Sequence, residues 1–153
     1  MRLTLLRSPN YPDPTGDKGV HDFTYSIYPH SGDWRVGDTV REAYKLNVPL
    51  MTASASGETA AASLSGVSFA EINRANVILD TIKGAEDGDG IIVRVYESQG
   101  ARCNAALTFG FDVKSAAECN LMEVWEQDLE VADNKLNFYI KPYEIKTFRI
   151  KKS

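Results

Sequence analysis

Two histidines close together in the sequence are the first candidates for chemistry. They lie in GVHDFTYSIYPH, residues 19–30, as His21 and His30. Neutral imidazole is a common zinc ligand, and each zinc ligand must lie about 2 Å from the ion. Nine positions along an extended strand span about 30 Å, and an odd separation puts the two side chains on opposite faces. One strand therefore cannot bring both histidines to one metal without a sharp bend, and residues 19–30 are predicted to be a structural strand.

Other catalytic arrangements also lack support in the sequence. The chain has no Gly-x-Ser-x-Gly elbow, and neither cysteine lies near a histidine in sequence. The acidic run EDGDG, residues 86–90, lacks the spacing of a calcium loop and instead predicts a hairpin turn. Arg94, which follows that turn, is expected to be a surface or interface arginine. No spacing singles out two carboxylates for glycoside hydrolysis. The sequence thus predicts neither a catalytic residue nor a metal ligand in this chain.

Composition narrows the possible partners and locations. The 153 residues are 43% hydrophobic and 25% charged, with a net charge of −4 and a pI of about 5.2. Because no basic stripe and no run of about 18 apolar residues occurs, neither a nucleic acid nor a membrane is an expected partner. Cys103 and Cys119 suggest neither a disulfide framework nor a zinc site. These features together predict a cytoplasmic location.

The first third of the chain mixes predicted strands with one helix. Strands are expected at 2–7 and 19–30. A helix is expected at 38–47, with Asp38 as its N-cap and Pro49 after its end. The segment TASASGETAAAS, residues 52–63, has only one side chain that is not small, so it is predicted to be a connector and a domain boundary.

The rest of the chain has the pattern of an antiparallel β-sandwich. Short apolar segments alternate with turn residues about every ten positions. In the segment 104–113, Leu107, Phe109, Phe111 and Val113 alternate at period two, which predicts one strand with a single apolar face. Strands are predicted at 75–83, 91–98, 104–113, 117–125, 135–141 and 144–152.

Several blocks, in order and spacing, resemble the C-terminal β region of glycoside hydrolase family 38. They are LLRSPNYPDPTGDKGVHDFTYSIYPHSGDW, AYKLNVPL and ILDTIKGAEDGDGIIVRVYESQG. The most similar branch is the cytosolic and bacterial type of α-mannosidase, and the resemblance extends from Leu3 to about Ile150.

The resemblance implies a fold for this chain and a location for the catalytic residues of the enzyme. It implies an all-β chain, in which residues 1–51 are the last strands and the helix of a large β-supersandwich and residues 52–153 are a small antiparallel Ig-like β-sandwich. Family members are retaining α-mannosidases whose zinc ligands and aspartate nucleophile lie on an N-terminal barrel. The motifs of that barrel are not in this sequence, so this chain is expected to be inactive alone. Its expected partners are the catalytic domain of the same polypeptide and, through it, an α-mannoside substrate.

One loop is implied to lie near the sugar site of such an enzyme. In relatives, an acidic loop at this point faces the barrel pocket, and Asp13, Asp17 and Lys18 occupy it here. Some branches carry arginine in place of Lys18, and the two cations differ in the contacts they make. Plain turn chemistry is the alternative explanation for these residues.

Two other functions remain open on the sequence. A carbohydrate-binding β-sandwich module would use exposed aromatic side chains, for which Trp34, Tyr28, Tyr96 and Trp125 are available, although tryptophans also pack in cores. A free-standing interaction domain that shares only the fold is the third possibility.

Overall fold

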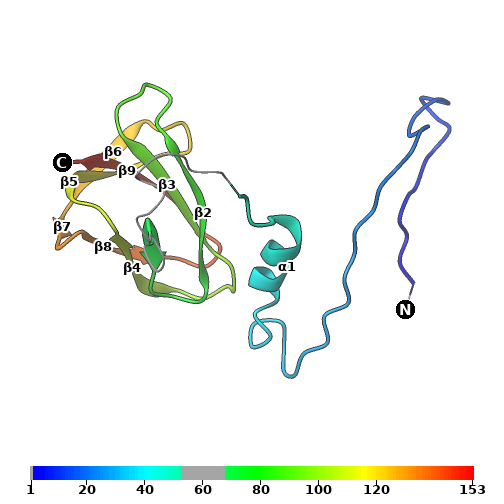
Figure 1. Ribbon diagram of the computed structural model, residues 1–153, viewed down its shortest axis with the longest axis horizontal. Helices are drawn as coiled ribbons and strands as arrows, with labels where there is room; N and C mark the ends of the chain where they lie inside the picture. Colours follow the sequence, from blue (N-terminus) through cyan, green and yellow to red (C-terminus); the bar gives the residue numbers. More distant parts are fainter. Residues whose placement is uncertain (1, 53–67) are drawn as a thin grey trace. The chain divides into compact units, whose positions relative to one another are not determined.

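The computed structural model describes residues 2–52 and 68–153, which belong to two compact units, Met1–Leu50 and Met51–Ser153 (Figure 1). The predicted connector 52–63 lies outside the described residues, apart from Thr52. The assignment of residues 1–51 to a larger β-supersandwich stays a prediction.

The N-terminal unit contains the predicted helix. Helix α1 spans Thr39–Asn47, and its last turn is followed by Val48, whose N–H donates to Tyr44 O at 2.7 Å. Asp38 occupies the N-cap position in the left-handed conformation (φ 52°), but its side chain does not cap the helix and instead pairs with Arg41 at 3.6 Å. No helix in the described part of the chain has the length and apolar character of a membrane span.

The prediction of strands at 2–7 and 19–30 is wrong for this chain taken alone. Neither segment is hydrogen-bonded into a sheet, and large apolar side chains in both are exposed, among them Leu3, Phe23 and Ile27. A strand exists only through a partner that satisfies its backbone N–H and C=O groups, and no described segment supplies one. The residue pattern of these segments suits a strand, but the pairing is missing.

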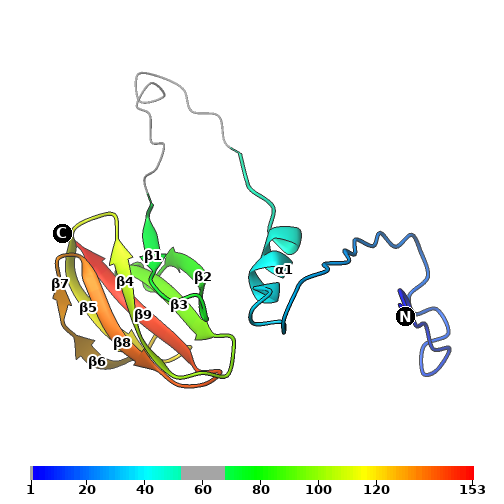
Figure 2. The same cartoon turned by 90° about the horizontal axis from the view of Figure 1, so that it is seen from below.

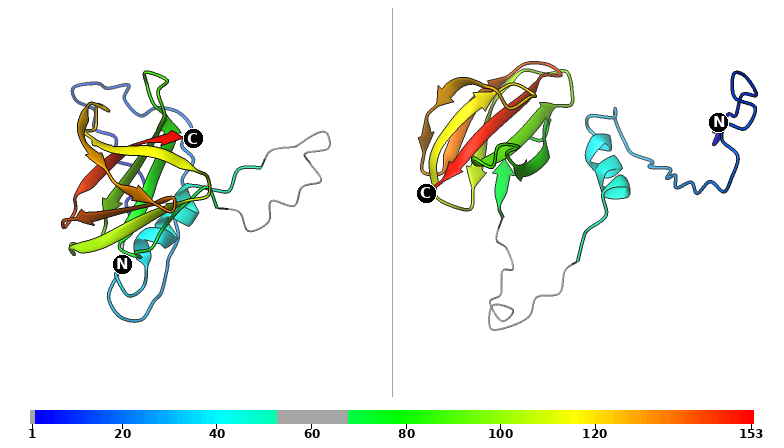
Figure 3. Two further views of the ribbon diagram at one scale, coloured as in Figure 1. Left: turned by 90° about the vertical axis from the view of Figure 1, so that its left-hand side faces the viewer. Right: turned by 90° about the horizontal axis from the view of Figure 1, so that it is seen from above.

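The second unit is an antiparallel β-sandwich, as the sequence predicts (Figure 2). One sheet has four strands in the order β1-β4-β8-β7, and the other has five in the order β2-β3-β9-β5-β6. We call them sheet A and sheet B, and Figure 3 shows their two layers from further sides. Sheet A is formed by β1 (Ala70–Ile72), β4 (Cys103–Phe109), β7 (Val131–Ala132) and β8 (Lys135–Ile140). Sheet B is formed by β2 (Val77–Gly84), β3 (Ile91–Glu97), β5 (Val113–Cys119), β6 (Trp125–Leu129) and β9 (Ile145–Lys152).

The core lies between the two sheets and follows the period-two pattern of the strands. Phe138 of β8 and Phe148 of β9 meet across the sandwich with ring centroids 4.9 Å apart. Burying each such side chain contributes roughly 1.5–3 kcal/mol. The buried core residues are Val77, Val93, Val95, Ala105, Leu107, Phe109, Ala116, Leu136, Phe138, Ile140, Phe148 and Ile150.

Two predicted strands are each divided by a turn. The segment 104–113 breaks at Gly110, so that residues 104–109 belong to β4 and β5 begins at Val113, although Leu107, Phe109, Phe111 and Val113 all contact the core. The segment 117–125 breaks because Asn120 Oδ1 accepts the N–H groups of Met122 and Val124 at 2.9 and 3.1 Å. A single asparagine thus closes a local turn that competes with the strand.

Candidate functional site

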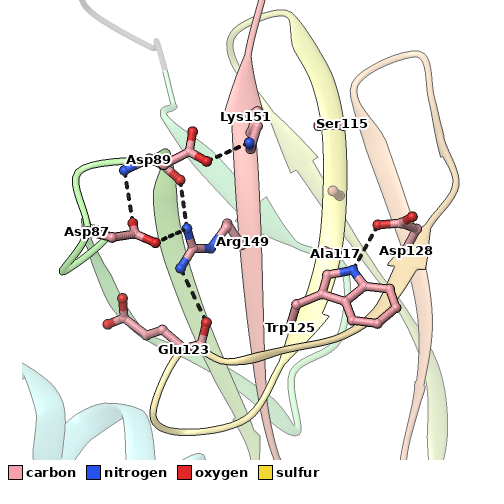
Figure 4. A pocket seen from close by; sticks show the side chains of 10 residues that line it. Asp87, Asp89, Ser115, Ala117, Glu123, Trp125, Asp128, Arg149 and Lys151 are labelled. Atoms are coloured by element: carbon pink, nitrogen blue, oxygen red, sulfur yellow. Dashed lines mark hydrogen bonds and ion pairs between the residues drawn. The ribbon is translucent and has the colours of Figure 1, made fainter.

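A groove on the outer face of sheet B brings charged residues and an exposed tryptophan together and is the candidate site of the second unit (Figure 4). Its volume is about 440 Å³. Small side chains of β5 leave space at its floor, and strand alternation turns Arg149 and Lys151 of β9 outward while Phe148 and Ile150 enter the core. The lining residues are Asp87, Asp89, Ser115, Ala116, Ala117, Glu123, Trp125, Asp128, Arg149 and Lys151.

Arg149 joins three parts of the sandwich at this groove. Its Nη1 donates to Asp87 Oδ2 at 2.7 Å and to Asp89 O at 3.1 Å, both in the β2–β3 turn. Its Nη2 donates to Glu123 O at 3.2 Å, in the β5–β6 loop. The hydrogen bond to Asp87 raises the pKa of Arg149, and the pKa of Asp87 is lowered first by the Asp89 N–H and then by Arg149. Lys151 Nζ pairs with Asp89 Oδ2 at 2.6 Å, so both cations of the groove face carboxylates.

Glu123 fixes the loop that forms the lower end of the groove. Its backbone is left-handed (φ 65°), and its side chain is almost fully buried. Lys83 Nζ lies 2.8 Å from Oε1, and Oε2 accepts the Glu86 N–H at 2.9 Å. These hydrogen bonds, first that from Lys83 and then that from the Glu86 N–H, lower the pKa of Glu123. The loop is therefore tied to the β2–β3 hairpin by an ionised carboxylate.

Trp125 forms an aromatic wall of the groove. Its indole N–H donates to Asp128 Oδ1 at 3.0 Å, which fixes the direction of the ring, yet the residue is 60% exposed. An exposed, oriented ring beside paired charges can hold an amphipathic ligand. Neither a histidine nor a cysteine is among the residues that line the groove.

The three predicted rim residues lie together on one exposed turn of the N-terminal unit. Asp13 Oδ1 accepts the N–H and hydroxyl of Thr15 at 2.8 and 2.7 Å, and these bonds lower the pKa of Asp13. Asp17 is left-handed (φ 57°), and Lys18 is exposed beside it. The turn satisfies itself through local contacts, and contact of Asp13, Asp17 or Lys18 with sugar stays a prediction.

Each of the two histidines contacts a nearby backbone carbonyl oxygen, and the two contacts are separate. His21 Nε2 lies 2.7 Å from Asp17 O, and His30 Nδ1 lies 3.3 Å from Ser31 O. Within residues 2–52 and 68–153, no group of three or more His, Cys, Asp or Glu side chains is arranged to hold a metal ion. Zinc, which the family resemblance assigns to the barrel, therefore finds no set of ligands among the described residues.

The four candidate aromatic residues have different surroundings. Tyr28 donates its hydroxyl to Gly37 O at 3.1 Å, and Arg35 stacks on Trp34 at 4.5 Å, both within the N-terminal unit. Tyr96 is half-buried in β3. Of the four, Trp125 is the one that lines the groove of sheet B.

Apart from Trp125, the sequence did not indicate the residues that shape this groove. Arg149 and Glu123 carry no motif, and their partners are distant in the chain, so only the folded register brings them together. Arg94 donates to Leu121 O at 2.8 Å and therefore supports the same loop. The period-two pattern of EIKTFRIKK was the available signal, because it places Arg149 and Lys151 on one outer face.

Comparisons with known proteins agree with the fold. Residues 76–148 match the family model described as the glycosyl hydrolases family 38 C-terminal beta sandwich domain. Alpha-mannosidase G of Dictyostelium discoideum is 41% identical over 96% of this chain and 14% of its own length. Human Alpha-mannosidase 2C1 is 33% identical over 95% of this chain and 14% of its length. Alpha-mannosidase of Saccharomyces cerevisiae (strain ATCC 204508 / S288c) is 31% identical over 98% of this chain and 16% of its length.

Nearly the whole chain thus matches these relatives, but it spans only 14–16% of their length. The matched segment begins next to β2 and ends in β9, and so includes most of the sandwich. The resemblance seen in the sequence is confirmed: the chain belongs to glycosyl hydrolase family 38 and carries its C-terminal β-sandwich domain.

Proposed function

We propose that this chain is the non-catalytic C-terminal β region of a retaining α-mannosidase, where it supports the catalytic barrel and completes the rim of its sugar site. The observation that carries the proposal is the strand-like segment 19–30. Its alternate residues Phe23, Tyr25 and Ile27 are 47%, 64% and 72% exposed. Apolar residues at period two indicate a strand that packs on one face.

Residues 1–51 complete a larger β domain in this proposal, and residues 52–153 form the terminal sandwich. A neighbouring strand of the same polypeptide would pair with segment 19–30 and cover Phe23, Tyr25 and Ile27. Pairing would satisfy the backbone groups and remove the exposed apolar row from water.

The catalytic chemistry belongs to the N-terminal catalytic domain of the same polypeptide. Zinc or another divalent metal, the nucleophile and the acid would lie there, and the α-mannoside bound for hydrolysis would meet this chain at the rim, near Asp13, Asp17 and Lys18. The enzyme would work in the cytoplasm. Support for that location comes from Cys103 and Cys119, which are both free thiols.

The first test is activity of the purified 153-residue chain. An aryl α-mannoside supplied with Zn²⁺ or Co²⁺ should show no turnover above a protein-free blank. Saturable hydrolysis by the pure chain, abolished by a chelator, would refute the non-catalytic role.

The second test concerns the packing of segment 19–30 in the proposed longer polypeptide. Ile27→Asp places a charge on the apolar face and should lower the thermal midpoint and the activity together. Thr24→Asp introduces the same charge on the opposite face and is the matched control. Equal effects of the two variants would show that this face does not pack against the rest of the enzyme.

A carbohydrate-binding β-sandwich module is the second candidate function. The observation that favours it is the exposure of Trp125 beside the polar groove of sheet B. Saturable sugar binding by a chain without any catalytic domain in its gene would favour the module over the mannosidase region.

A further inference from the structure

We propose that the groove between Trp125 and Arg149 binds a neutral pyranoside, with the indole ring as the platform for the apolar face of the sugar. The choice of a mannoside as the ligand rests on the proposed function. The residues that line the groove all belong to the second unit (Figure 4).

Trp125 has the two properties that a sugar platform needs. It is accessible, because 60% of the residue is exposed. It is also held in place, because its indole N–H donates to Asp128 Oδ1 at 3.0 Å. Binding would therefore lose little free energy in ordering the ring. A pyranose has an apolar face of C–H groups, which suits an amphipathic ring of this kind.

The floor of the groove leaves room for a ring to lie against the sheet. The outward side chains of β5, Ser115 and Ala117, are small at the point where Arg149 and Trp125 stand on either side. The volume of about 440 Å³ falls in the range of small-molecule sites. The Ser115 hydroxyl and the Asp128 carboxylate supply a donor and acceptors for sugar hydroxyls.

The charges favour a neutral ligand over an anion. Arg149 is paired with Asp87 at 2.7 Å, and Lys151 with Asp89 at 2.6 Å. A phosphate or carboxylate ligand would have to compete with these carboxylates for each cation. A polyhydroxylated ligand can instead add hydrogen bonds to the oxygen atoms that remain accessible.

The test uses the indole N–H signals of the 153-residue chain in a titration with methyl α-mannopyranoside. The chain has two tryptophans, Trp34 and Trp125, so it gives two indole resonances, and Trp34→Phe assigns them. We expect the Trp125 signal to shift with saturation at a dissociation constant of about 1–10 mM, the strength usual for a ligand of this size. The Trp34 signal, in the other unit, should not move.

Two variants and one control locate the binding. Ala117→Leu fills the floor without removing a polar partner and should abolish the saturable shift, while the chain remains folded by circular dichroism. Trp125→Ala should abolish sugar binding as well. Because this variant lacks the Trp125 indole signal, binding is monitored through the backbone amide signals of β5 and β9. Tyr139→Ala removes an exposed aromatic of sheet A, 46% exposed, and should leave binding unchanged.

Each other outcome overturns the proposal. A linear drift of both indole signals would indicate nonspecific contact, and saturation that survives Ala117→Leu would place the sugar elsewhere. Loss of binding in Tyr139→Ala alone would assign it to sheet A. Failure of the groove to bind sugar would leave the non-catalytic role intact, because that role is tested by hydrolysis and by Ile27→Asp.

Discussion

Glu97 accepts the N–H of Tyr143 at 3.0 Å and so ties the end of β3 to the loop before β9, across 46 positions of sequence. The same carboxylate accepts N–H groups from Asn76, Gln99 and Gly100 at 2.9, 2.9 and 2.8 Å. Glu97 is only 1% exposed. Burial alone would raise its pKa, but the hydrogen bonds outweigh this effect and the pKa of Glu97 is lowered. A buried carboxylate that accepts several N–H groups organises one end of the sandwich.

Glu97→Gln should destabilise the chain by about 2–4 kcal/mol. The amide keeps one acceptor oxygen, but its NH₂ group then faces N–H donors that have lost their partner. Urea unfolding followed by circular dichroism measures the change. Glu126→Gln, which makes the same chemical change at an exposed position of β6, is the control and should stay within about 0.5 kcal/mol of the wild type. Equal stabilities of the two variants would contradict the role of Glu97.

Acid should weaken the fold through the same carboxylate. The unfolded chain binds a proton at Glu97 near the ordinary value of 4.5, whereas the folded chain, with its lowered pKa, resists protonation. The stabilisation is therefore complete above that value and is lost as the pH falls through the folded pKa. The difference in unfolding free energy between wild type and Glu97→Gln should shrink as the pH is lowered below 4.5. A difference that stays constant or grows in acid would exclude this linkage.

The sequence predicted those parts of the fold that depend on local pattern. The hairpin at EDGDG, the helix at 39–47 and the strands near 135–141 and 144–152 all occur. The breaks inside 104–113 and 117–125 were missed because each depends on a contact rather than on periodicity. Gly110 passes close to Ser68, and Asn120 accepts two N–H groups of its own loop.

The candidate groove could not be predicted in the same way. Its residues come from positions that are far apart in the chain, such as Asp87 and Arg149, and no short motif joins them. Trp125 was one of four aromatic candidates, and only the fold separates it from Trp34 and Tyr28. For segment 19–30 the residue pattern predicted a strand, but no described segment pairs with it.

Gly110→Ala should destabilise the sandwich strongly. A Cβ at this position would lie 2.1 Å from the carbonyl oxygen of Ser68, a backbone atom that cannot rotate away. The same approach allows the Gly110 N–H to donate to Phe69 O at 3.1 Å. We expect a loss of about 2 kcal/mol or more, measured by urea unfolding. Gly84→Ala is the matched control, since its Cβ would meet no atom within 4 Å. A neutral Gly110→Ala would mean that β1 does not approach β4 so closely.

Arg149→Lys should cost about 1–3 kcal/mol, although it keeps the positive charge. Lysine can keep the contact with Asp87 but cannot also donate to Asp89 O and Glu123 O, which the guanidinium does simultaneously. Lys151→Met is the comparison: its pair with Asp89 is exposed, so its loss should cost no more than about 0.5 kcal/mol. The opposite order of the two effects, measured by thermal or urea unfolding, would show that the loop is not held through Arg149.

The two cysteines should differ in their reaction with a thiol reagent. Cys119 is 3% exposed, and burial raises the pKa of its thiol, so little of the reactive thiolate forms near neutral pH. Cys103 is only half-buried, with its sulfur 3.7 Å from Asn76 Nδ2. Under native conditions at mildly alkaline pH, the reagent should therefore modify Cys103 first, and Cys119 should react only when denaturant opens the sandwich. Cys103→Ser should remove the fast phase and leave the slow one. If neither thiol reacted even in denaturant without reductant, the cysteines would be oxidised, and the proposed reducing location would be wrong.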